Sequence, residues 1–65
     1  MRIYRVELMA AMLVRSTTEV RAILPFKAAE HVAGQPVTLR RNEQDWIRVT
    51  ELTGQQRSFA YVVRG

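Results

Sequence analysis

Sixty-five residues without a cysteine leave this chain few ways to become stable. A chain of this length buries only about 60% of the surface that it exposes when unfolded, so its hydrophobic core is small. The absence of cysteine excludes disulfides and thiolate metal sites, and the single histidine, His31, is too little for most zinc sites. We therefore expect one domain, residues 1–65, with no metal and no cofactor. We expect it to gain stability from association with a larger partner or, as a homodimer, with a second copy.

The positive charge of the chain comes almost entirely from arginine. Ten lysines and arginines stand against six acidic residues, which gives a net charge of +4, and Lys27 is the only lysine. Arginine has a planar, forked head group that suits phosphate, carboxylate and aromatic partners. The acidic residues are interspersed, and no basic run exceeds the pair Arg40–Arg41. The charge therefore permits contact with nucleic acid without requiring it, and a merely solvated surface is the alternative.

No segment is predicted to enter a membrane. The longest apolar run, Leu8 to Val14, has seven residues, whereas a spanning helix needs about 20. The run also lacks the cleavage pattern of a secretory leader. We expect a cytoplasmic protein with no membrane partner.

Residues 3–15 fit two periods. With a period of two, the even-numbered residues from Tyr4 to Val14 form one apolar face. As a helix, the run Leu8–Leu13 consists of strong helix formers. The β-branched and aromatic residues at the start favour a strand. We expect a strand over 3–15, a turn at Ser16–Thr18 and a second strand from Val20 to Leu24, which together make a hairpin.

A short helix is predicted after the hairpin. Pro25 suits the first helical position, where its missing N–H would be unpaired in any case. The segment Phe26–Ala33 has good helix propensity, and Gly34 supplies a left-handed terminator. One side of this helix is apolar and is expected to pack on the sheet; it carries Phe26, Ala29, Val32 and Ala33.

The C-terminal half indicates a meander of three strands: Val37–Arg41, Trp46–Leu52 and Arg57–Arg64. Polar turns separate them at Asn42–Asp45 and Thr53–Gln56. The predicted fold is therefore α+β, a twisted antiparallel sheet with one short helix packed on one face, in the order ββαβββ.

Alternation gives these three strands two different sides. The apolar side faces the core and carries Val37, Leu39, Ile47, Val49, Phe59, Tyr61 and Val63. The other side carries the candidate partner-binding residues Thr38, Arg40, Trp46, Arg48 and Arg64. Arginine and tryptophan stack on bases, clamp side chains and dominate protein interfaces. The alternative is that Trp46 covers the edge of the core and the arginines only solvate the sheet.

No constellation of catalytic residues is visible, and we expect no enzymatic activity. His31 is the only imidazole and falls near the end of the predicted helix, where its partial charge suits the helix dipole. Ser16 and Ser58 lack a nucleophile-elbow motif. The three glycines are isolated, so no phosphate-binding loop is present. The alternative is a small ribonuclease toxin that uses arginine and His31.

Three stretches and one tryptophan resemble a known family. The stretches are Val20–Ala22, Ala28–Ala33 and Val37–Arg41, and the tryptophan is Trp46. In order, they give a strand that ends a hairpin, a short alanine-containing helix, an arginine-bearing strand and a strand with a tryptophan. This order is similar to that of an anti-CRISPR protein that inhibits a type I surveillance complex, over roughly half of the chain.

The resemblance implies a phage or mobile-element protein that acts in the host cytoplasm. It would bind a host protein or ribonucleoprotein complex and prevent recognition of target DNA, with weak nucleic-acid contact at most. The positive charge argues against mimicry of DNA, which needs an acidic surface. The residues alone leave an alternative open, a small basic nucleic-acid-binding or regulatory protein.

Overall fold

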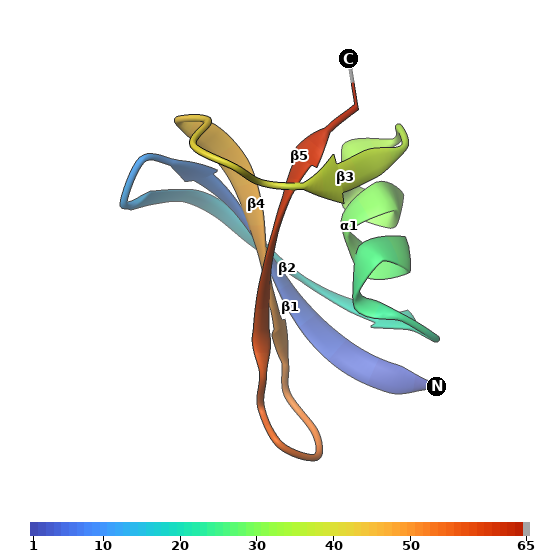
Figure 1. The fold of residues 1–65 in the computed structure, drawn as a ribbon. Coiled ribbons are helices and arrows are strands. Elements are labelled where there is room, and N and C mark those ends of the chain that lie inside the picture. The colour runs from blue at the N-terminus through green and yellow to red at the C-terminus, as the bar shows by residue number, and fades with distance from the viewer. Residues whose placement is uncertain (65) are drawn as a thin grey trace.

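One short helix crosses one face of a five-stranded antiparallel sheet in the computed structural model, which describes residues 1–64 (Figure 1). The elements are β1 (Arg2–Ala10), β2 (Leu13–Ala22), α1 (Pro25–Ala33), β3 (Val37–Leu39), β4 (Asp45–Glu51) and β5 (Ser58–Val63). The α+β class and the order ββαβββ are confirmed. Within the described residues, no helix is long and apolar enough to cross a membrane.

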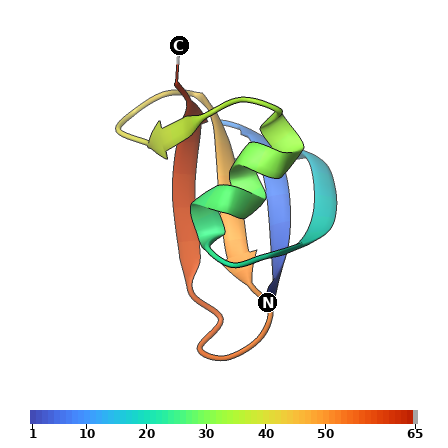
Figure 2. The same cartoon turned by 90° about the vertical axis from the view of Figure 1, so that its right-hand side faces the viewer.

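The strands lie in the order β2-β1-β4-β5-β3, so the predicted meander is wrong in its connections. β3 pairs with β5 and not with β4. The cause is the whole segment between β2 and β3, α1 with its two connections, which takes the chain from the β2 edge of the sheet to the far edge (Figure 2). The centre of the sheet is instead occupied by β4, whose Ile47 and Val49 are buried. β3 has only three residues and lies at the edge, where Leu39 stays exposed.

The N-terminal segment forms a hairpin of two strands, but its turn is not where the sequence predicts it. The chain reverses at Ala11 and Met12, and Ala11 has a left-handed φ of 54°. Ser16–Thr18, the predicted turn, lies inside β2 and is exposed. The prediction failed because the true turn contains no glycine, proline or asparagine. The pairing also shifts between Leu8 and Met9, where β2 carries a bulge.

The helix is confirmed at both ends. Pro25 occupies its first turn, and Gly34 closes it at a φ of 70°, with its N–H donating to the Glu30 carbonyl. Ala28 and Ala29 are completely buried, and both belong to the main core. Two side chains this small let the helix backbone lie close to the sheet. The sequence analysis assigned Ala29 to the packed side but missed Ala28.

The core lies between α1 and the sheet. Its largest fully buried side chains are Tyr4, Val6 and Val49, from β1 and β4. Phe59 and Tyr61 of β5 add aromatic area, with ring centroids 6.4 Å apart. The predicted alternation of inward and outward residues therefore holds for β4 and for β5 up to Tyr61. It fails at the end of β5, where Val62, predicted to point outward, is buried and Val63, predicted to face the core, is 41% exposed.

The close approach of α1 to the sheet predicts a strong size effect at its buried alanines. Ala29→Leu should lower the free energy of unfolding by about 1–3 kcal/mol, because it overpacks a filled space. His31→Leu, on the exposed side of the same helix, should change it by no more than about 0.5 kcal/mol. Urea unfolding measures both. Equal effects of the two variants would contradict the packing described here.

Candidate partner-binding face

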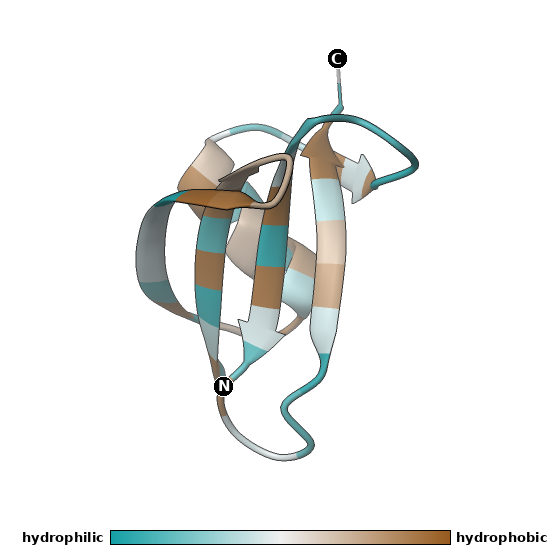
Figure 3. Ribbon diagram, turned by 90° about the vertical axis from the view of Figure 1, so that its left-hand side faces the viewer, coloured by the Kyte–Doolittle hydropathy of each residue, from teal (hydrophilic) through white to brown (hydrophobic). Residues whose placement is uncertain are grey.

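The sheet side opposite α1, the open face, is covered by no helix within residues 1–64 (Figure 3). Strand alternation and the pairing registers place on it the residues that point away from the helix. They are Thr17, Glu19 and Arg21 of β2, Arg5, Glu7 and Met9 of β1, Trp46, Arg48 and Thr50 of β4, Ser58, Ala60 and Val62 of β5, and Thr38 of β3. The hydropathy along β1 and β4 alternates visibly in Figure 3.

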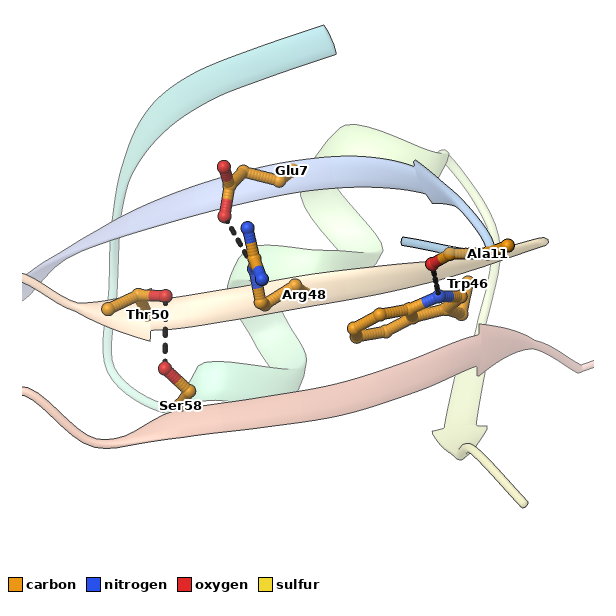
Figure 4. A network of polar contacts seen from close by, with 6 residues as sticks. All are labelled: Glu7, Ala11, Trp46, Arg48, Thr50 and Ser58. Carbon is orange, nitrogen blue, oxygen red and sulfur yellow. Dashed lines mark hydrogen bonds and ion pairs between the residues drawn. The ribbon is translucent and has the colours of Figure 1, made fainter. Parts of the chain in front are cut away.

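Trp46 is held in a fixed position on this face. Its indole N–H donates to the Ala11 carbonyl at 2.8 Å, which ties β4 to the turn of the hairpin (Figure 4). The Arg40 guanidinium lies over the Trp46 ring, 4.2 Å from its centroid. Arg40 itself is held by a bond from its Nε to the Glu43 carbonyl. The ring is half-buried, and Trp46 pairs with Met9 of β1. The Met9 side chain is buried but does not belong to the main hydrophobic core.

Arg48 and Glu7 form an ion pair across β1 and β4. The Arg48 Nε donates to Glu7 Oε1 at 2.8 Å, and Glu7 is only 7% exposed (Figure 4). This hydrogen bond lowers the pKa of Glu7, the charges of Arg48 and Arg5 act in the same direction, and burial opposes them. The same bond raises the pKa of Arg48. Much of the Arg48 charge is thus compensated within the molecule.

Three of the five predicted site residues come together. Arg40, Trp46 and Arg48 gather on the open face, although β3 and β4 are not neighbours. The loop after β3 carries Arg40 back toward β4, and its backbone N–H donates to the Ala60 carbonyl of β5. Sequence reasoning placed these residues together for the wrong reason, because it assumed that their strands pair.

Thr38 and Arg64 take no part in the contacts that hold this group, although Thr38 points to the same side of the sheet as Arg40. Thr38 is opposite Val62 at the β3 edge and is exposed. Arg64 follows the end of β5, is also exposed, and donates its backbone N–H to the Pro36 carbonyl. Among the described residues, no side-chain hydrogen bond or ion pair joins either one to Arg40, Trp46 or Arg48.

The sequence analysis missed the contribution of the N-terminal hairpin to this face. Arg5 and Arg21 are exposed, and within residues 1–64 neither makes a side-chain hydrogen bond or an ion pair. Arg5 is opposite Glu19 in the register. The signal was present, because Arg5 and Glu7 alternate with Tyr4 and Val6. The misplaced turn hid the equivalent alternation in β2.

A concavity lies at the Trp46 end of the sheet, with walls from both the helix side and the open face. A pocket of about 650 Å³ opens beside the C-terminal end of α1, with apolar walls from Leu8, Val32, Ala33 and Ile47 and a rim that includes Arg15. Across the described residues, no group of three or more histidines, cysteines or acids is arranged to hold a metal ion. Met9, Trp46 and Val62 of the open face also line this pocket, so the pocket adjoins the candidate site at Trp46.

In comparisons with known proteins, no family model matches the chain, and neither a curated protein nor a solved structure shows significant similarity to it.

The Glu7–Arg48 pair predicts a defined loss of stability in acid. Because the pKa of Glu7 in the folded state lies below its ordinary value of 4.5, its charge stabilises the protein above that value. The contribution is lost as the pH falls through the lowered pKa. Glu7→Gln should therefore be less stable than the parent at neutral pH, and the difference should shrink in acid. Urea unfolding over a pH series measures it; a difference independent of pH would contradict the pairing.

The Trp46 indole bond predicts a local effect at the hairpin turn. Trp46→Phe keeps an aromatic ring but removes the donor to Ala11, which should cost about 0.5–1.5 kcal/mol of stability. Amide exchange at Ala11, whose N–H donates to the Gln44 carbonyl, should become faster, because the turn loses its second tie to β4. Unchanged exchange at Ala11 would show that the indole does not hold the turn.

Proposed function

We propose that the protein is not an enzyme and that it acts by binding a host ribonucleoprotein complex through the open face. The observation that supports this most is the contrast between two kinds of arginine on that face. Arg48 is paired with a buried carboxylate and Arg40 is stacked on a ring. Arg5 and Arg21 are exposed without such a contact. Guanidinium groups that form no ion pair within the described residues, placed beside a fixed aromatic ring, suit an anionic partner.

The charge balance of the open face supports an anionic partner. Four arginines reach it, Arg5, Arg21, Arg40 and Arg48. Two glutamates accompany them, Glu7 and Glu19, and Glu7 is already paired with Arg48. The face therefore keeps an excess of positive charge, which attracts RNA phosphates or acidic protein surfaces and increases the rate of association.

Anti-CRISPR activity is the specific form of this proposal. The support is the resemblance of the hairpin, helix and arginine-bearing strand to an inhibitor of a type I surveillance complex. A basic inhibitor would contact the backbone subunits or the guide RNA of such a complex and so block recognition of target DNA. Its place of action would be the host cytoplasm.

Direct binding of free nucleic acid is the second candidate. It is favoured by exposed arginines outside the open face as well, among them Arg41 and Arg57. Such binding would depend little on the shape of one face and strongly on salt, because counterions are released when phosphates are neutralised. The two candidates therefore differ in salt dependence and in which arginines matter.

A charge-matched pair of variants tests the proposal. Arg5→Ala/Arg21→Ala removes two charges from the open face, and the control Lys27→Ala/Arg57→Ala removes two exposed charges elsewhere, Lys27 on α1 and Arg57 beside the helix-side hollow at Pro25. Binding to a purified type I surveillance complex with its guide RNA should weaken at least tenfold, about 1.4 kcal/mol, in the first variant only. Both variants should unfold like the parent.

Two outcomes would decide against the proposal. Equal losses in both double variants, with free oligonucleotides bound as well as the complex and a steep salt dependence, would favour general nucleic-acid binding. No binding of the parent to the complex or to its RNA would remove the ribonucleoprotein partner altogether.

A further inference from the structure

Of the two edges of the sheet, the outer edge of β2 is the longer. β2 has ten residues and pairs only with β1, whereas the opposite edge strand, β3, has three. Seven consecutive residues of β2, from Leu13 to Glu19, are exposed. An edge of this kind is a template for pairing with another strand unless charges, a proline or a covering element prevent it. β2 contains no proline, and α1 leaves its outer edge uncovered.

The registers show which backbone groups of this edge are free. The Leu52 N–H donates to the Ile3 carbonyl, so the odd-numbered residues of β1 direct their backbone groups toward β4. The even-numbered residues of β1 then pair with β2, where they meet Ser16, Thr18, Val20 and Ala22. Since these groups alternate along a strand, the N–H and C=O of Thr17, Glu19 and Arg21 point away from the sheet.

We propose that β2 pairs antiparallel with β2 of a second copy, with Thr17 on the two-fold axis. In this register, the backbone groups of the two Thr17 residues exchange hydrogen bonds. Arg15 of each copy comes opposite Glu19 of the other, which places two ion pairs symmetrically about the axis. The strand is self-complementary in charge, as a two-fold interface requires. This inference concerns the edge of the sheet and does not rest on the proposed function.

The charges favour this register over those centred further toward the C-terminal end of β2. Centring on Thr18 brings Arg15 opposite Arg21, and centring on Glu19 brings that carboxylate opposite its own copy; both cost energy. Centring on Val20 places Glu19 of one copy opposite Arg21 of the other, which is also favourable, but this register pairs only the last part of the strand. The Thr17 register overlaps β2 along most of its length, up to the bulge near Arg15.

The exposed apolar residues at the two ends of β2 support the same register. Met12 and Leu13, at the hairpin turn, are 83% and 73% exposed, and Ile23, just past the other end of β2, is 69% exposed. Antiparallel pairing about Thr17 brings the turn of one copy alongside Ile23 and Leu24 of the other. The solvent-accessible surface of the protein is 4614 Å², above the roughly 4,250 Å² typical of a monomer of its mass. Burial of these residues in a dimer would reduce this excess surface.

The dimer would have one continuous sheet of ten strands. Because the two-fold axis is perpendicular to the sheet, both helices would lie on one side and both open faces on the other. Arg21 and Arg5 of the two copies would then flank the junction, and the positively charged surface would be doubled in area.

A charge exchange tests the register. Sedimentation equilibrium over a micromolar concentration series should show a monomer–dimer equilibrium for the parent. Arg15→Glu and Glu19→Arg should each weaken the dimer at least tenfold, because like charges then face each other. The double variant Arg15→Glu/Glu19→Arg should restore it. Arg21→Glu is the matched control, because Arg21 lies on the same strand but belongs to neither proposed ion pair. It should change the dissociation constant of the dimer little.

Amide exchange in the unmodified protein gives a second readout that requires no variant. Exchange at Thr17 and Glu19 should slow as concentration rises, because their N–H groups become bonded across the axis. A parent that remains monomeric throughout the series would overturn the proposal. A dimer whose dissociation constant is unchanged by Arg15→Glu and by Glu19→Arg would also overturn it. The same holds if Arg21→Glu weakens the dimer as strongly as Arg15→Glu does.

Discussion

The pairing of β1 with β4 is the contact on which the rest of the molecule depends. It joins the N-terminal hairpin to the C-terminal strands, which are more than thirty residues apart in the chain. On the helix side, this seam packs Tyr4 and Val6 beside Val49, the three largest fully buried side chains. On the open face, it places Glu7 against Arg48 and Trp46 against the hairpin turn. One seam thus builds both the core and the candidate binding surface.

Different interactions stabilise the two sides of the β1–β4 pairing. The helix side gains its free energy from apolar burial, which is non-directional and tolerates no polar group without a partner. The open face uses directional contacts, and these constrain Arg48, Arg40 and Trp46 before any partner arrives. A fixed aromatic ring loses little entropy on binding. The exposed Arg5 and Arg21 remain available, so binding specificity would come from the hairpin as much as from the C-terminal strands.

The local features of the fold were predictable because they depend on near neighbours in sequence. Pro25 and Gly34 bound the helix through backbone geometry, and the alternation around Ile47 and Val49 assigned the two faces of β4. The strand order was not predictable in this way. It depends on where α1 delivers the chain, and no local pattern encodes that position. The turn at Ala11 also lacked a signal, because alanine rarely adopts a left-handed φ.

The candidate site was predicted in part for the same reasons. Alternation alone put Trp46 and Arg48 on one face, and their contacts with Ala11 and Glu7 depend on the long-range seam. Arg5 and Arg21 could be assigned only once the hairpin turn was placed correctly. Alternation also put Thr38 on this face, opposite Val62, but neither Thr38 nor Arg64 takes part in the contacts that hold the group.

Cross-saturation from a type I surveillance complex to the isotopically labelled protein would test the central claim, that the open face is the contact surface. The account predicts signal loss at the side chains of Arg5 and Arg21 and at the Trp46 indole, with α1 largely unaffected. Signal loss confined to α1 would contradict it, and would place the partner on the helix side of the sheet.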